Sequence, residues 1–388
     1  MMPSLPLNFD ELRCAARRRL PKGVFDYIDR GTEDEVALSD NRRALDAIKF
    51  LPFALRDVSS RSLNVNLFGQ PQSSPFVVAP TAMAGLVWRN GEVELAKAAA
   101  ATGIPFCVAT QSITPIETIA ETGARLWFQL YLWHDRTLSD QLIERAWVAG
   151  AETLLLTVDT PVSPNREFNI RNGFGLPFKL SFRAGVDIAR HPSWLFGVIL
   201  PALIENKMPT FAHYPAGERL AISRAPTSGP NRLADSLNWS DVERLRARWK
   251  GKLILKGILR VDDALKASAL GVDGVVVSNH GGRVLDGAIA PARVLQAIAD
   301  AVGSRICVLA DSGVRRGSDA VKLLALGARA VLVGRMPLFG TAWRGTDGAA
   351  HALATLHAET ERTMAMVGVR NVNEIGLNLL HRDGLTVY

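Results

Sequence analysis

The most informative stretch of this sequence is Asp273-Gly274-Val275-Val276-Val277, which continues into Ser278-Asn279-His280-Gly281-Gly282-Arg283. A short β-branched run after a glycine is typical of a buried parallel strand, which places the polar hexapeptide at the C-terminal end of that strand. In α/β folds the active site lies at that end. A histidine followed by two glycines and an arginine fits a general base beside an anion-binding group. The alternative is a histidine that caps a loop.

Seven further apolar runs of this kind occur along the chain. The eight predicted strands are residues 76–79, 106–109, 126–130, 153–158, 253–256, 275–277, 306–309 and 330–333. Helical patterns follow at residues 92–102, 115–122, 137–149, 262–270, 291–301, 317–326 and from 337 onward. Because the crossovers are short and no block of strands is antiparallel, the pattern predicts an α/β fold, a closed (β/α)8 TIM barrel, rather than an open sheet.

We expect one domain over residues 1–388. It has a helical N-terminal extension at 1–75, the barrel at 76–345 and a helical C-terminal tail at 346–388. The fourth βα loop contains an insertion at 160–236. Since connections of about 2–6 residues are usual there, this length indicates a lid, a binding segment or a partner contact.

The centre of the insertion, residues 194–201, is apolar and aromatic, and basic residues surround it. These are Arg183, Arg190, His191 and Lys207. The composition suits a peripheral membrane contact through residues 183–207. Packing against the helices of the barrel is an equally weighted alternative.

Composition excludes several classes of protein. The hydrophobic share of 48% and charged share of 21% are those of a globular protein. The net charge is +7, but no arginine-rich arm accompanies it, so we expect no nucleic-acid partner. Cys14, Cys107 and Cys307 form no CxxC pair, and no signal peptide or run of about 18 apolar residues occurs. We therefore expect a cytoplasmic protein, with peripheral contact at the inner membrane left open by the insertion.

Polar residues follow the predicted strands, where one mouth of the barrel would gather them. After the last two strands come Asp311-Ser312-Gly313-Val314-Arg315 and Gly334-Arg335. Barrels commonly bind phosphate at this place through glycine N–H groups, and arginines add charge-assisted hydrogen bonds. No GxGxxG after a first strand, no GxxxxGK[ST] and no HExxH is present, so the pattern predicts a phosphorylated ligand without a metal site.

Other polar residues at the strand ends suit a flavin ring, whose edge both donates and accepts hydrogen bonds. They include Thr81, Gln129, Thr157 and Ser278, and Lys256 would add a charge that stabilises the reduced ring. Arg166 and Arg283 remain for a substrate carboxylate. If Asp159 faces His280, it would stabilise the imidazolium formed when His280 takes a hydroxyl proton, which indicates a 2-hydroxy acid.

The sequence resembles the FMN-dependent (S)-2-hydroxy acid dehydrogenases and oxidases, which include glycolate oxidase, L-lactate dehydrogenase and (S)-mandelate dehydrogenase. The matching motifs cover nearly the whole chain. They are Phe25-Asp26-Tyr27-Ile28, Ala79-Pro80-Thr81-Ala82, Trp127-Phe128-Gln129-Leu130-Tyr131, Thr157-Val158-Asp159, Lys256-Gly257, Ser278 to Asp286, Asp311 to Gly317 and Val333-Gly334-Arg335.

The resemblance implies roles for individual residues. His280 would be the base with Asp159 as its partner, Arg166 and Arg283 would bind the substrate carboxylate, and Tyr27 and Tyr131 would place hydroxyls near the substrate. The implied FMN contacts are Pro80, Thr81, Ala82, Thr110, Gln129, Thr157, Lys256, Ser278, Asp311, Gly313, Arg315, Gly334 and Arg335.

The resemblance also implies a reaction. An (S)-2-hydroxy acid, mandelate-like or lactate-like, would become a 2-keto acid with hydride transfer to flavin N5, and a quinone-type acceptor would take the electrons. The nearest overall likeness is to (S)-mandelate dehydrogenase, which uses its insertion to sit on a membrane, and a homotetramer is implied. Ala82 stands where that enzyme has glycine and where oxidases have alanine, so an oxidase that releases hydrogen peroxide remains the alternative. Gln111 replaces a tryptophan of glycolate oxidase, which disfavours glycolate.

Overall fold

The computed structural model describes residues 5–174, 181–204, 209–215 and 232–381. Eight parallel strands close into one barrel, in the order in which they follow along the chain. They are β4 (Phe76–Val78), β5 (Phe106–Ala109), β6 (Leu126–Leu130), β7 (Thr153–Thr157), β8 (Lys252–Ile258), β9 (Gly274–Val277), β10 (Cys307–Ala310) and β11 (Ala330–Val333). Strand β11 pairs with β4, which closes the barrel and confirms the predicted fold.

The strands are apolar throughout because both faces of the barrel wall are buried. In β9, Val276 points into the barrel interior, whereas Val275 and Val277 belong to the core between the wall and the helices. Phe68 and Trp127 pack edge to face at 5.9 Å in the interior cluster. The continuous β-branched runs of the sequence therefore reflect burial on two sides.

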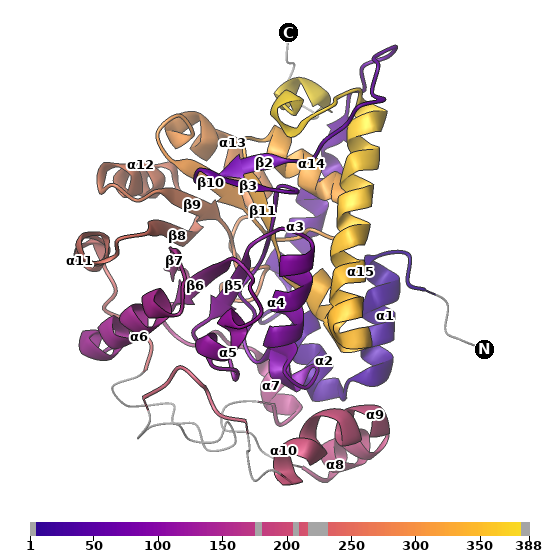
Figure 1. The fold of residues 1–388 in the computed structure, drawn as a ribbon, viewed down its shortest axis with the longest axis vertical. Helices are drawn as coiled ribbons and strands as arrows, with labels where there is room; N and C mark the ends of the chain where they lie inside the picture. Colours follow the sequence, from indigo (N-terminus) through magenta and orange to yellow (C-terminus); the bar gives the residue numbers. More distant parts are fainter. Residues whose placement is uncertain (1–4, 175–180, 205–208, 216–231, 382–388) are drawn as a thin grey trace.

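Helices surround the barrel (Figure 1). They are α4 (Gly91–Ala101), α5 (Ile116–Ala120), α6 (Arg136–Val148), α11 (Trp239–Arg248), α12 (Val261–Ala269), α13 (Pro291–Val302), α14 (Gly317–Ala325) and α15 (Arg335–Val367). All but α11 were expected within a few residues of these bounds. Helix α15 is kinked at Arg344 and Gly345, and its long C-terminal part packs on α4 and α14.

The N-terminal extension begins with α1 (Phe9–Arg19), α2 (Lys22–Asp29) and α3 (Val36–Ala47). It also contains the short strands β1 (Lys49–Phe50), β2 (Val65–Leu67) and β3 (Gln70–Gln72), which the sequence patterns did not predict. Strand β1 pairs with β12 (Leu380–His381) in the C-terminal tail. Strands of two or three residues are too short to show a period, which explains why they were missed.

The insertion after β7 is described in part, and Lys207 lies outside the described residues. It contains α7 (Glu167–Arg171), α8 (Phe182–Ala189), α9 (Pro192–Trp194), the π-helical turn η2 (Leu195–Ile199) and α10 (Leu200–Ile204). Trp194 is buried and its Nε1 donates a hydrogen bond to the Leu86 carbonyl at 2.7 Å, whereas Phe196 is 63% exposed. The segment therefore both packs on the barrel and presents apolar surface. Among the described residues no helix is long and apolar enough to cross a membrane.

Candidate active site

The loop after β9 has three consecutive residues in the left-handed region of backbone conformation, which explains its two glycines. His280, Gly281 and Gly282 have φ angles of 58°, 66° and 72°, in the left-handed region. Gly282 also approaches helix α3 so closely that a Cβ atom there would lie 2.5 Å from the Leu38 Cα, so only glycine fits. Asn279 exchanges two side-chain hydrogen bonds with Asn41 of α3, at 2.8 and 2.9 Å. The N-terminal extension thus holds the loop that carries His280.

His280 lies between an aspartate and a tyrosine. Its Nδ1 is 3.0 Å from Asp159 Oδ1, and its Nε2 is 3.4 Å from the Tyr131 hydroxyl. Burial lowers the pKa of His280, so the imidazole is neutral near pH 7 and Nε2 can accept a proton when Nδ1–H donates to Asp159. Burial also raises the pKa of Tyr131 to about 12, which keeps this hydroxyl protonated as a hydrogen-bond donor.

The buried Lys256 lies between the carboxylates of Asp159 and Asp311. Lys256 Nζ lies 3.0 Å from Ser278 Oγ, 3.4 Å from Asp311 Oδ2 and 3.9 Å from Asp159 Oδ2. Burial would lower the pKa of Lys256, but the two carboxylates outweigh it and raise the pKa. Burial would likewise raise the pKa of Asp159, but His280 and Lys256 hold it below its usual value. Both groups are therefore charged at neutral pH.

Arginine side chains collect on the other side of the cavity. Arg283 and Arg335 both donate to the Ile28 carbonyl, at 3.1 and 3.0 Å, and Arg166 Nε donates to the Arg283 carbonyl at 3.2 Å. Burial, with the nearby charges of Arg166 and Arg335, lowers the pKa of Arg283 well below its usual value. Burial lowers the pKa of Arg335 to about 10. Burial therefore disfavours the positive charge of these arginines, and an anionic ligand would offset that cost, which indicates a site for anionic ligands.

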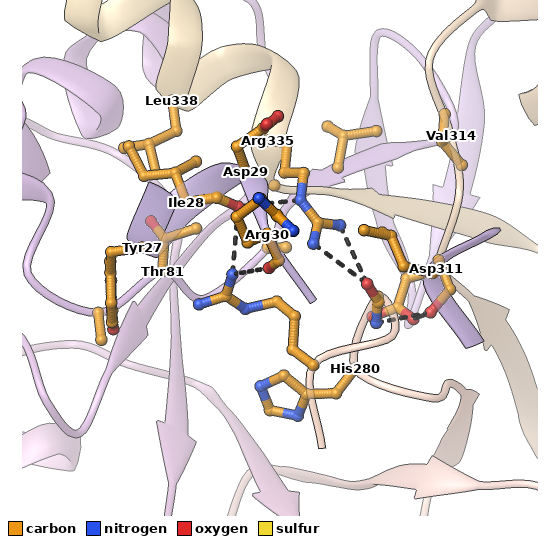
Figure 2. A pocket seen from close by; sticks show the side chains of 18 of the residues that line it. Tyr27, Ile28, Asp29, Arg30, Thr81, His280, Asp311, Val314, Arg335 and Leu338 are labelled. Atoms are coloured by element: carbon orange, nitrogen blue, oxygen red, sulfur yellow. Dashed lines mark hydrogen bonds between the residues drawn. The ribbon is translucent and has the colours of Figure 1, made fainter. Parts of the chain in front are cut away.

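These residues share one cavity of about 590 Å³ (Figure 2). Thr81 Oγ1 is buried beside it without a hydrogen-bond partner among the described residues, as expected of a group that serves a ligand. The predicted site residues on its wall are Tyr27, Pro80, Thr81, Ala82, Gln129, Tyr131, Arg166, Lys256, His280, Arg283, Asp311, Gly313, Arg315, Gly334 and Arg335. Thr110, Thr157, Asp159 and Ser278 lie behind the wall and hydrogen-bond to residues on it.

Several contacts that shape the cavity were not anticipated. Arg42 donates to the Gly313 carbonyl at 2.6 Å and pairs with Asp319 at 2.7 Å, which fixes the loop after β10. Ser312 Oγ accepts a hydrogen bond from Gly281 N–H at 3.0 Å and so joins two site loops. The sequence predicted only a helical extension over residues 1–75, which does not show that Asn41 and Arg42 of α3 face the barrel mouth.

The chain matches the model of the FMN-dependent dehydrogenase family over residues 16–382. It is 38% identical over 380 residues to (S)-mandelate dehydrogenase of Pseudomonas putida, and the alignment covers 98% of this chain and 95% of that protein. It is 41% identical over 374 residues to L-lactate dehydrogenase of Caulobacter vibrioides, covering 95% and 96% of the two chains. A crystal structure of the monotopic membrane protein (S)-mandelate dehydrogenase superposes with a TM-score of 0.91 at 38% identity, covering 97% of this chain and 99% of that one.

The chain therefore belongs to the FMN-dependent dehydrogenase family. This confirms the predicted family of 2-hydroxy acid dehydrogenases and oxidases, and with it the cofactor FMN. The residues present fit that cofactor. The Thr81 hydroxyl, which has no partner in the described part of the chain, and the Gln129 amide could serve a polar ring edge. The glycines and arginines after β10 and β11 could hold a phosphate.

Proposed function

We propose that this enzyme oxidises a mandelate-like or lactate-like (S)-2-hydroxy acid to the 2-keto acid and passes the electrons to a quinone-type acceptor. The observation that carries the proposal is the contact of His280 Nδ1 with Asp159 at 3.0 Å, with Nε2 facing a cavity that also holds buried arginines. A base and a carboxylate-binding group in one cavity match a substrate that bears both a hydroxyl and a carboxylate.

The substrate carboxylate would bind to Arg283 and Arg166, whose positive charges meet at one side of the cavity. The substrate hydroxyl would then lie near His280 Nε2 and the hydroxyls of Tyr131 and Tyr27. His280 removes the hydroxyl proton at Nε2, and the ionised Asp159 stabilises the resulting imidazolium through Nδ1–H. Tyr131 remains protonated and orients the hydroxyl oxygen.

The cofactor would occupy the inner part of the cavity. Gly313, Arg315, Gly334 and Arg335 would bind its phosphate group. The ring would lie against Pro80, Thr81, Ala82, Gln129, Lys256 and Asp311, with Thr110, Thr157 and Ser278 supporting these contacts from behind. When bound, FMN supplies the hydride acceptor at its N5 atom. The charged Lys256 favours the extra negative charge of the reduced ring.

One residue favours a second candidate function, an oxidase that uses O2 and releases H2O2. Ala82 lines the cavity, and by resemblance alanine at this position is the residue of oxidases and glycine that of mandelate dehydrogenase. Gln111 also lines the cavity, where it would polarise the region next to the substrate side chain. The two candidates share the base and the carboxylate site, and they differ only in how the reduced enzyme is reoxidised.

The test is anaerobic mixing of the FMN-loaded protein with (S)-mandelate, L-lactate or glycolate, followed by admission of air. Loss of flavin absorbance with mandelate or lactate, and slow recovery in air until a quinone is added, is the expected result. Fast recovery with stoichiometric H2O2 would favour the oxidase. If none of the three acids bleaches the flavin, the proposed function is refuted.

We also propose a peripheral membrane contact through the insertion, and a homotetramer by resemblance to the family. Several apolar side chains of the insertion are exposed, among them Phe182 (88%), Phe196 (63%) and Ile204 (73%). These three lie on α8, η2 and α10, which are grouped at one end of the molecule (Figure 1). Exposed aromatic and aliphatic residues near basic ones suit the interfacial region of an anionic bilayer.

A further inference from the structure

The short helix α2 connects the insertion to the substrate cavity. On one side it carries Tyr27, which lines the cavity. The carbonyls of Ile28, in the last turn of α2, and of Arg30, which follows the helix, accept hydrogen bonds from Arg283 at 3.1 and 2.9 Å. The Arg283 guanidinium lies 5.3 Å from the centre of the Tyr27 ring. Any shift of α2 would therefore move two of the groups placed around the substrate carboxylate.

The start of α2 is held by the insertion. Pro21, which precedes the helix, makes no side-chain cap. Instead the first N–H of the helix, that of Lys22, donates to Asp187 Oδ2 of helix α8 at 2.6 Å. One turn further on, Asn172 Nδ2 donates to Asp26 Oδ2 at 2.8 Å. A helix of only eight residues is marginally stable by itself, so α2 depends on these contacts with the insertion for its stability and its position.

An aromatic contact joins the insertion to Tyr27, the residue of α2 that lines the cavity. The ring of Phe174, in the insertion, lies 5.5 Å from the ring of Tyr27 between centroids. Gly23 makes room for it, since a Cβ atom there would lie 3.2 Å from Phe174 Cδ2. At the end of α2 the Arg30 guanidinium lies 3.5 Å from the centre of the Phe168 ring. The insertion thus contacts α2 from its first residue to the one that follows its last.

We infer that Phe174 and Asp187 are positioning residues for the substrate carboxylate. They hold α2 so that the Tyr27 hydroxyl and the Arg283 guanidinium face the same point in the cavity. The inference rests on the proposed function. His280 and Asp159 follow strands of the barrel wall instead, so loss of either positioning residue should weaken substrate binding and leave proton removal intact.

The test compares Phe174→Ala and Asp187→Ala with conservative variants and with matched controls. Phe174→Tyr keeps the ring and Asp187→Asn keeps an acceptor oxygen, so both should restore wild-type behaviour. Val162→Ala and Asp235→Asn change exposed side chains of the same insertion, at positions outside helices α7 and α8, which pack on α2. The measurements are KM and kcat for the 2-hydroxy acid that reduces the wild-type enzyme, and hydrogen–deuterium exchange of the amides of α2.

We expect KM to rise about tenfold in the two alanine variants, kcat to stay within about twofold, and the α2 amides to exchange faster. Wild-type KM and exchange in both variants would overturn the inference, as would equal effects in the controls. A fall in kcat at constant KM would also overturn it, because the damage would then lie at the base. If no acid reduces the wild-type flavin, the proposed function fails separately. The exchange data then still decide, since unchanged exchange refutes the role of the two residues and faster exchange supports it.

Discussion

Asp159 Oδ1 lies 3.0 Å from His280 Nδ1, although 121 residues separate the two in the chain. The contact arises because β7 and β9 both flank β8, so that the ends of these strands meet at one mouth of the barrel. It gives the imidazole a fixed orientation and a countercharge. The roles of the base His280, its partner Asp159 and the nearby cation Lys256 can therefore be measured one by one.

Replacing His280 by Asn should reduce the rate of flavin reduction by about 10³-fold, because among the described residues no other histidine lines the cavity. Asparagine tolerates the left-handed backbone, with φ of 58°, that this position requires. The variant should retain FMN, as checked by its absorbance spectrum after gel filtration. Stopped-flow reduction near the wild-type rate would exclude His280 as the base.

Replacing Asp159 by Asn should lower kcat/KM by about 10²–10⁴-fold, because the imidazolium loses its countercharge. Burial lowers the pKa of His280, whereas the Asp159 carboxylate raises it. Removing the carboxylate therefore lowers the pKa of His280 further, and the acid limb of the kcat/KM profile should move to lower pH. A profile from pH 4 to 8 measures this, and a limb that moves to higher pH would contradict the assignment.

Replacing Lys256 by Met should destabilise the protein by about 3–5 kcal/mol, because Asp159 and Asp311 then lose the cation buried between them. Lys252→Met is the matched control on the same strand. Its side chain is 45% exposed and its ion pair with Asp273 is worth about 1 kcal/mol or less. Chemical denaturation of the cofactor-free proteins gives both values. Equal effects of the two substitutions would show that the buried charges do not matter.

Buried His213 should make stability depend on pH. Burial lowers the pKa of His213 to about 4, and its Nδ1 lies 3.1 Å from the Ala109 carbonyl. Between pH 6.5 and 4 the unfolded chain binds a proton at this residue that the folded one does not, so stability falls as the pH falls, by about 1.4 kcal/mol per unit. His213→Gln should remove that share of the slope. Denaturation midpoints of both proteins at pH 4.5 to 7.5 test this, and parallel curves would refute it.

Replacing Phe182 and Phe196 together by Ser should lower binding to anionic vesicles at least about tenfold, because each exposed ring would lose about 1.5–3 kcal/mol of burial in the bilayer. Leu55→Ser is the control, since Leu55 is fully exposed but belongs to the N-terminal extension. Vesicle co-sedimentation measures the difference. If the wild-type protein does not sediment with vesicles of anionic lipid, the proposed membrane contact is wrong.

Much of the fold could be read from local patterns. The strand Gly274–Val277 and the helix Pro291–Val302 were predicted because burial of a strand on two faces gives a continuous apolar run, and burial of a helix on one face gives a helical period of apolar residues. The residues at the strand ends, such as His280 and Asp311, followed from the barrel prediction, because parallel strands bring their C-terminal ends together. Helix α11 and the short strands outside the barrel, β1, β2, β3 and β12, were missed, since their patterns are weak or too short.

The sequence by itself determined the order of strands and helices, the barrel and the residues gathered at its mouth, because these depend on periodicity and chemistry along short segments. The tertiary structure alone decided which side chains point into the cavity. Thr110 and Thr157 lie behind the wall, Arg42 of α3 braces the loop after β10, and the insertion caps α2 through Asp187. Those contacts join residues far apart in the chain, and their geometry exists only once the barrel has closed and the extensions have packed upon it.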